Sequence, residues 1–229
     1  MKPENENISF YNEIASDYDA ILDTEETNDS VRSKVKEKFS GLVESGTVLD
    51  FGGGTGLDLK WLTANGYQVL FCEPSPGMRK LAINRSLELP NKQNIKFINN
   101  DLSDFSKWHT SPPCQLQIDA ILSNFAAINC IQNIELLFAN LGNIIKPGGQ
   151  FIMLVLQHGY KKNSWWKFRK FLRGTLTGES LTLLIKFKNE YQTVYVHTKK
   201  ELATAATPFF KIISREDVQE FTMFHLIRK

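Results

Sequence analysis

The feature that most constrains the fold is a glycine-rich turn, Asp50-Phe-Gly-Gly-Gly-Thr-Gly56. It stands between a short apolar run at 47–51, typical of a buried strand, and a helix-forming segment at 57–64. Glycines let the backbone turn sharply and approach a ligand closely, and the helix beyond supplies free amide donors at its N-terminus. In a parallel sheet such a turn lies at the carboxyl edge, so its position predicts a nucleotide-like ligand.

Short apolar runs alternate with helical patterns from this turn to residue 157. Strands are predicted at 47–51, 68–73, 95–99, 118–122 and 151–157, with helices at 57–64, from Ser75 to before Pro90, and at 134–145. The alternation predicts a Rossmann-like α/β fold, a mostly parallel sheet with helices on both faces. Near the end, Lys211–Ile213 and Phe221–Ile227 lie close in sequence, which favours an antiparallel pair.

The 229 residues suit one α/β domain, and no Pro/Gly/Ser linker divides them, so we expect a single domain over 1–229. Two amphipathic patterns, one near 10–22 and one starting at the cap Ser30, predict an N-terminal helical cap over 1–45. Residues 159–197 interrupt the alternation. They predict an insertion that serves as a lid and binds the acceptor.

Composition excludes several classes of protein. The three cysteines are odd in number and lack metal-like spacing, so neither a disulfide scaffold nor a metal site is expected. The polar start excludes a secretory signal, and the longest apolar run, Phe151–Leu156, is too short for a transmembrane segment. These features favour a cytoplasmic protein. The net charge of +2 supplies no global attraction to nucleic acid.

Acidic residues end three consecutive predicted strands: Asp50, Glu73 and Asp101. A carboxylate at Asp50 disfavours a pyrophosphate but suits an ammonium group, Glu73 can accept from both ribose hydroxyls, and Asp101 from an exocyclic amine. The dinucleotide fingerprint needs a glycine where Leu57 stands, which disfavours a nicotinamide dehydrogenase. An amine, a ribose and an adenine without phosphates describe S-adenosylmethionine.

Together these motifs resemble the class I S-adenosylmethionine-dependent methyltransferases, especially their small-molecule branch. The resemblance covers about residues 8–157 and rests on Val48–Gly56, Glu73-Pro74, Asn100-Asp101-Leu102, Phe125 after the fourth strand, Lys146-Pro-Gly-Gly149 and the opening Tyr11-x6-Tyr18-Asp19. It implies a seven-stranded sheet with an antiparallel last strand. The cofactor would be S-adenosylmethionine, with S-adenosylhomocysteine as the product.

The resemblance also implies the cofactor-binding residues. Those for the methionine portion are Asp50 and the backbone of Gly52, Gly53, Gly54 and Gly56; those for the ribose and adenine are Glu73, Pro74, Asp101 and Leu102. Near the sulfonium they are Asn124 and Phe125, and over the cofactor Tyr11 and Tyr18. The structural alternatives are helix packing for the tyrosines, a simple turn for Asp101, and a βα turn without ligand for the glycines.

Methyl transfer from a sulfonium is an in-line displacement, so orientation supplies much of the rate. A general base is needed only if the acceptor loses a proton. His158, after the fifth strand, is the candidate base, with a surface-loop histidine as the alternative. His197 could face the same pocket, whereas His109 and His225 look structural.

The acceptor is less constrained by the sequence. The segment 160–173 has six basic residues and no acid, with an apolar helical face at Trp165, Phe168, Phe171 and Leu172. It suits a solvated lid helix, a pocket for an acidic or phosphorylated acceptor, or a membrane-touching helix with a lipid-like acceptor. DNA is disfavoured because Ser123-Asn-Phe-Ala stands where amino-methylating DNA enzymes carry a Pro-Pro-aromatic motif.

The predicted function is therefore methyl transfer to oxygen, nitrogen or carbon of a small molecule. An RNA methyltransferase is a possible but less favoured alternative, because the chain lacks a wider basic surface. A non-catalytic protein that binds S-adenosylmethionine is the alternative from another class.

Overall fold

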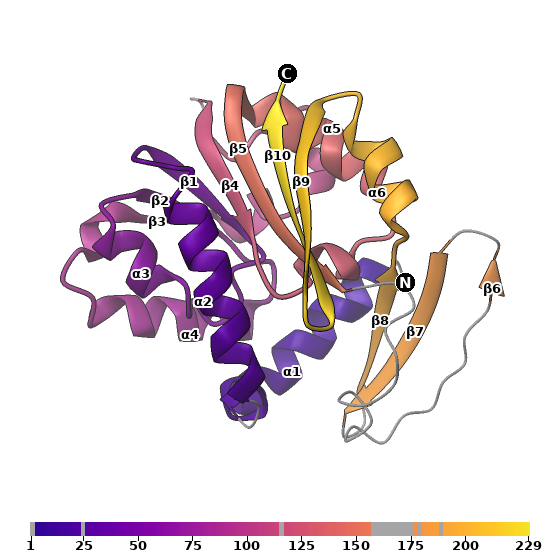
Figure 1. Ribbon diagram of the computed structural model, residues 1–229. Helices are drawn as coiled ribbons and strands as arrows, with labels where there is room; N and C mark the ends of the chain where they lie inside the picture. The colour runs from indigo at the N-terminus through magenta and orange to yellow at the C-terminus, as the bar shows by residue number, and fades with distance from the viewer. Residues whose placement is uncertain (1–2, 24–25, 115–116, 157–175, 178–179, 188–189) are drawn as a thin grey trace.

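The computed structural model describes residues 3–23, 26–114, 117–156, 176–177, 180–187 and 190–229. The strands of its main sheet are β1 Thr47–Phe51, β2 Gln68–Cys72, β3 Ile95–Phe97, β4 Ile118–Ser123, β5 Ile145–Leu156, β9 Phe210–Val218 and β10 Phe221–Arg228. They lie in the order β3-β2-β1-β4-β5-β10-β9 (Figure 1). The first five are parallel, and β10 runs antiparallel to both β5 and β9. The predicted fold class and the antiparallel last strand are confirmed.

Helices cover both faces of this sheet. They are α1 Pro3–Asp23, α2 Glu26–Ser40, α3 Leu59–Ala64, α4 Pro76–Leu87, α5 Ile134–Ile144 and α6 Lys199–Ala206, with short 3₁₀ turns η1 Lys92–Asn94, η2 Asn100–Leu102, η3 Phe105–Lys107 and η4 Ala127–Cys130. Buried residues of α2, α3 and α4 pack on one face, and those of α5 and α6 on the other. Helix α1 lies along the carboxyl edge of the parallel strands, at the bottom of Figure 1.

A second, antiparallel sheet stands beside the main one (Figure 1). Its strands are β6 Leu176–Thr177, β7 Ser180–Phe187 and β8 Glu190–Val196, all within the predicted insertion. Asn7 fastens α1 to β8: its Nδ2 donates to the Thr193 carbonyl at 2.8 Å, and its Oδ1 accepts from the Thr193 amide at 2.8 Å. The amphipathic pattern at 165–172 lies outside the described residues.

Two predicted boundaries are wrong. Strand β5 begins at Ile145 rather than at residue 151, so it includes the Lys146-Pro-Gly-Gly149 segment that was expected to precede it. Helix α2 begins at Glu26, so Ser30 lies inside it and is not its cap. Asp29 falls in the first turn, where its negative charge interacts favourably with the positive end of the helix dipole. The apolar face holds as expected, since Val31, Val35 and Phe39 are buried.

The described residues lack two features, a helix that could span a membrane and a cluster of potential metal ligands. There, no helix joins the length and apolar character that crossing a bilayer requires. No three potential metal ligands gather in the same residues either. The cysteines Cys72, Cys114 and Cys130 are free thiols.

Candidate functional site

The glycine-rich turn is tied to the neighbouring strand. The amides of Gly52 and Gly53 donate to the Cys72 carbonyl at 2.9 and 3.2 Å, which holds the ends of β1 and β2 together. Gly52 has a φ of +72° and Gly54 one of +57°, a region that residues with a Cβ rarely adopt. An added Cβ at Gly52 would lie 2.4 Å from the Cβ of Ala127, whereas nothing lies within 4 Å of one at Gly54. The backbone at Gly54 is therefore open to a ligand.

Asp50 is a buried carboxylate at this edge, and one of its oxygens, Oδ2, makes no hydrogen bond to the described residues. Burial raises the pKa of Asp50 well above its usual range, and the negative charge of Asp58 raises it further, while Arg32 opposes both. Because an unpaired buried acceptor costs free energy, this carboxylate suits a cationic partner.

Glu73 stands at the end of β2, beside the turn. Its Oε2 accepts from the Gly54 amide at 3.0 Å and its Oε1 from the Ser75 amide at 2.8 Å. Burial raises the pKa of Glu73 to about 7, although both amides act to lower it. Strands β1 and β2 are neighbours, with Asp50 paired to Phe71, so the two acids share one short stretch of the edge.

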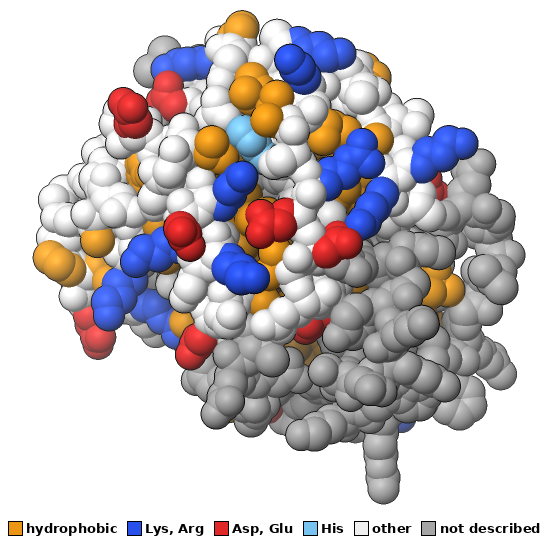
Figure 2. Space-filling view, viewed as in Figure 1, with side chains coloured by type: hydrophobic (Ala, Val, Ile, Leu, Met, Phe, Trp, Pro, Cys, Tyr) orange, Lys and Arg blue, Asp and Glu red, His pale blue; other side chains and the backbone are white. Residues whose placement is uncertain are grey.

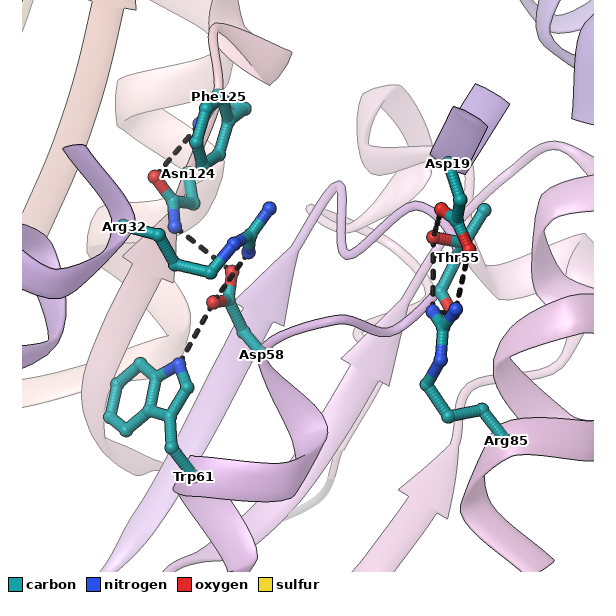
Figure 3. A network of polar contacts seen from close by, with 8 residues as sticks. All are labelled: Asp19, Arg32, Thr55, Asp58, Trp61, Arg85, Asn124 and Phe125. Atoms are coloured by element: carbon teal, nitrogen blue, oxygen red, sulfur yellow. Dashed lines mark hydrogen bonds and ion pairs between the residues drawn. The ribbon is translucent and has the colours of Figure 1, made fainter. Parts of the chain in front are cut away.

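Asp58, at the start of α3, is the centre of a second polar cluster (Figure 3). Its side chain does not cap its own helix. It accepts instead from Arg32 Nη1 at 2.6 Å, Trp61 Nε1 at 2.8 Å and Asn124 Nδ2 at 2.9 Å. The Arg32 guanidinium also lies over the Phe125 ring, 4.5 Å from its centroid. Neither Arg32 nor Asp58 was predicted from the sequence. The spacing after Gly56 is the one signal that points to Asp58, and no local pattern points to Arg32.

The charges around the turn are unequal. Among the described residues, the charged groups that act on buried Asp50 are the buried carboxylates of Asp58 and Glu73 and the guanidinium of Arg32. Arg85, also at the turn, is paired with Asp19. An excess of negative charge in a poorly solvated site favours a ligand that carries positive charge.

A third cluster fastens α1 to the glycine turn (Figure 3). The Thr55 hydroxyl donates to Asp19 Oδ1 at 2.6 Å. Arg85 of α4 donates to Asp19 Oδ2, to the Thr55 carbonyl and, at 3.1 Å, to the Thr55 hydroxyl. About two turns earlier in α1, Asn12 Oδ1 accepts from the Gly77 amide at the start of α4, at 2.8 Å. Helix α1 is thus held directly over the predicted ligand edge.

Tyr11 joins α1 to the second sheet. Its hydroxyl accepts from Gln192 Nε2 at 2.6 Å and lies 3.6 Å from Cys130 Sγ, while the Tyr18 ring packs edge-on with centroids 5.9 Å apart. Burial is the main cause that raises the pKa of Tyr11, Tyr18 and Cys130. These groups therefore stay protonated at neutral pH.

The remaining predicted residues are spread more widely. Asn124 is buried and Phe125 half-buried at the end of β4, whereas Pro74 is half-buried directly after Glu73. Asp101 is exposed on η2, and Leu102 packs against the core. Asp101 is therefore open to solvent, and its contact with the adenine stays a prediction.

The histidines differ in their surroundings. His158 lies outside the described residues. His197 is buried, stacks on Tyr195, and has Nε2 at 2.9 Å from the Ile131 carbonyl, so this ring nitrogen is already engaged. His225 Nε2 lies 2.7 Å from Gln150 Oε1, across the β10–β5 pair, as a structural histidine would.

Comparisons with known proteins agree with this geometry. A family model described as "Methyltransferase domain" matches residues 24–205. No curated protein sequence matches the chain. The similar solved structures include a DhpI complex with S-adenosylhomocysteine, with a TM-score of 0.72 and 17% identity over 99% of this chain and 97% of that one.

Two further structures are similar. The glycopeptide N-methyltransferase MtfA in complex with S-adenosyl-L-homocysteine has a TM-score of 0.64 and 14% identity, over 86% of this chain and 89% of that one. The CcbJ methyltransferase from Streptomyces caelestis has a TM-score of 0.64 and 14% identity, over 84% and 87%. At these identities the structures establish a shared fold.

Proposed function

The chain belongs to the family of methyltransferase domains, and we propose that it transfers a methyl group from S-adenosylmethionine to a small-molecule acceptor. The resemblance to class I S-adenosylmethionine-dependent methyltransferases predicted from the sequence is thereby confirmed. The observation that carries the proposal is the buried Oδ2 of Asp50, which has no hydrogen-bond partner among the described residues, near the open backbone of Gly54. DhpI and MtfA, which share this fold, were solved with S-adenosylhomocysteine bound.

The residues present fit this cofactor group by group. Asp50 would hold the ammonium of the methionine portion, and the glycine backbone from Gly52 to Gly56 would lie against it. Glu73 would exchange its two amide contacts for the ribose hydroxyls. Asn124 and Phe125 would border the sulfonium, and Asp101 with Leu102 the adenine. The excess of buried carboxylates over the Arg32 guanidinium supports a ligand that carries positive charge.

S-adenosylmethionine supplies a methyl group already activated on a sulfonium, so little covalent chemistry is left to the protein. The chain contributes orientation and the exclusion of water. Helix α1 serves both purposes, because Asn7, Asn12 and Asp19 hold it across the carboxyl edge.

Proton transfer depends on the acceptor. Tyr11, Tyr18 and Cys130 keep their protons at neutral pH, so they act as hydrogen-bond donors rather than bases. His158 remains the proposed general base, positioned after β5 by the sequence alone. His158→Ala should slow turnover while leaving the affinity for S-adenosylhomocysteine unchanged; unchanged turnover would contradict this role.

The acceptor is proposed to bind beside the insertion, residues 159–197, whose described part is the second sheet. Gln192 from β8 already reaches the Tyr11 hydroxyl, so the insertion contributes side chains next to α1, the helix that covers the carboxyl edge and is called the cover helix below. On the face in Figure 2, basic and acidic side chains of the described residues are interspersed. On this face the described residues therefore form no continuous basic track of the kind that RNA favours.

The experiment that tests the function is thermal unfolding with S-adenosylhomocysteine, beside a matched run with NAD. A ligand at 100 times its dissociation constant stabilises by about 2.7 kcal/mol, or roughly 5–11 °C for a chain this size. We expect a shift with S-adenosylhomocysteine alone. A shift with NAD alone would overturn the proposal. Binding without turnover on any acceptor would select the non-catalytic alternative, and a strongly salt-dependent affinity for RNA would select the RNA enzyme.

A further inference from the structure

Four residues form a closed ring of contacts at the end of β4 (Figure 3). Arg32 Nη1 donates to Asp58 Oδ1 at 2.6 Å, and Asn124 Nδ2 donates to Asp58 Oδ2 at 2.9 Å. The Asn124 Oδ1 then accepts from the Phe125 amide at 2.9 Å, and the Phe125 ring lies under the Arg32 guanidinium. The members come from α2, from the N-terminal cap of α3 and from the turn that follows β4, so the ring joins three separate segments.

The ring holds a strained turn in place. Phe125 has a φ of +44° and Ala126 one of +61°, two consecutive residues in the left-handed region without glycine. A strained backbone conformation of this kind is retained only where several surrounding contacts hold it in place. Here Asn124 fixes the Phe125 amide, the guanidinium covers the Phe125 ring, and the Ala126 amide donates to the Leu154 carbonyl at 3.0 Å.

The ring also carries a charge pair whose field reaches the cofactor edge. The side chains of Arg32 and Asp58 are 21% and 8% exposed, so solvent screens them weakly. Arg32 acts to lower the pKa of Asp50 and of Tyr18, which lie at the edge and in the cover helix. Asp58 acts on Asp50 in the opposite direction.

We infer that the Arg32–Asp58 pair is a positioning element, which orders the Asn124–Phe125 turn and balances the charge beside it, so that loss of either charge alone changes the preference between cationic S-adenosylmethionine and neutral S-adenosylhomocysteine. This inference rests on the proposed function. While the pair is intact its two charges nearly cancel. Removing Arg32 leaves a carboxylate that attracts the sulfonium, and removing the charge of Asp58 leaves a guanidinium that repels it. The two ligands differ in charge at this one group, so their affinity ratio isolates the effect.

The experiment is isothermal titration of both ligands into the wild type and into Asp58→Asn, Arg32→Gln and the double variant. We expect Asp58→Asn to reduce the preference for S-adenosylmethionine about fivefold and Arg32→Gln to increase it by a similar factor. The double variant should return within about twofold of the wild type, because it is again neutral. Raising the salt concentration should shrink both single-variant effects.

Trp61→Phe is the matched control, since it removes one hydrogen bond to Asp58 but leaves the ring and its charges in place. It should not alter the ratio. Equal weakening of both ligands in the two single variants, or an unchanged ratio, would overturn the inference and leave a purely structural role. If Asp58→Asn fails to fold, Arg32→Gln decides through the sign of its effect. A wild type that binds neither ligand would instead overturn the proposed function itself, and the inference with it.

Discussion

The carboxyl edge at β1 and β2 and the seam between α1 and β8 are built on opposite principles. At the edge, the buried carboxylates Asp50 and Glu73 lie near the open backbone of Gly54, and Oδ2 of Asp50 has no hydrogen-bond partner among the described residues. At the seam, neutral groups satisfy one another: Asn7 bonds the backbone of Thr193, and Gln192 bonds Tyr11. The buried carboxylate of Asp50 favours binding of a cation. The neutral hydrogen bonds between α1 and β8 have no such preference and hold the two elements together. We therefore expect changes at the edge to affect the cofactor and changes at the seam to affect the cover and the acceptor.

The largest expected effect is at Asp50. Asp50→Asn should weaken S-adenosylhomocysteine binding by about 2–3 kcal/mol, because a charge-assisted hydrogen bond to the ammonium is lost. 5′-Methylthioadenosine, which has the same nucleoside without the amino acid, should bind the variant as well as the wild type. Calorimetry with both ligands makes the comparison, and equal losses for the two would contradict the assignment. The fold should be retained, since the substitution removes an unpaired buried charge.

A smaller loss of binding affinity is expected when Glu73 is changed. Glu73→Gln should weaken both S-adenosylhomocysteine and 5′-methylthioadenosine by about 1–2 kcal/mol, because both carry the ribose and a neutral amide is the weaker acceptor. The same titrations test it, with Asp50→Asn as the internal contrast. A loss confined to S-adenosylhomocysteine would place Glu73 at the methionine portion instead.

The pH dependence of binding should follow Glu73. Burial raises its pKa from 4.5 to about 7. Between these values the free folded protein keeps a proton that the unfolded chain has lost, so the contribution of Glu73 to stability falls as the pH rises through this window. Ribose hydroxyls favour the ionised form, so affinity for S-adenosylhomocysteine should rise about tenfold from pH 6 to pH 8. Glu73→Gln should reduce this rise; an identical profile in the variant would assign the proton to another group.

The seam should respond in the opposite way. Asn7→Ala removes hydrogen bonds at 2.8, 2.8 and 3.1 Å and should lower the free energy of unfolding by about 1–2 kcal/mol. Affinity for S-adenosylhomocysteine should fall less than about threefold, because Asn12 and Asp19 still hold α1 to the edge. Urea unfolding and calorimetry measure the two quantities. A large loss of affinity for S-adenosylhomocysteine without a loss of stability would contradict the assignment of cofactor binding to the edge and of a scaffold role to the seam.

The smallest effect is expected where the regions meet. The Asp19–Arg85 pair is about one-third exposed on each side, so its contribution should be near 0.5 kcal/mol. Asp19→Asn should therefore raise the dissociation rate of S-adenosylhomocysteine by about two- to threefold, which stopped-flow displacement can resolve. An unchanged rate would mean that α1 does not limit release of the product.

The sequence predicted the parts of the site that depend on local pattern. Strand runs, helix periods and the glycine turn are read over a few residues, and the rule that parallel strands end at one edge then places Asp50 beside Glu73. The boundary of α2 was misplaced at Ser30, since several polar residues there could begin a helix. The second sheet was missed because the insertion carries no βα alternation.

The tertiary structure decided the long-range contacts and how deeply each side chain of the site is buried. Asp58 meets Arg32 across 26 residues of sequence and Asn124 across 66, and Asn7 meets Thr193 across 186. No local pattern encodes such a meeting, because each partner is an ordinary polar residue of its own segment. The raised pKa of Glu73 and the unpartnered oxygen of Asp50 likewise follow from what packs around them. The sequence alone determined which groups stand at the edge, and only the folded packing decided their charge balance, because desolvation depends on every neighbouring segment.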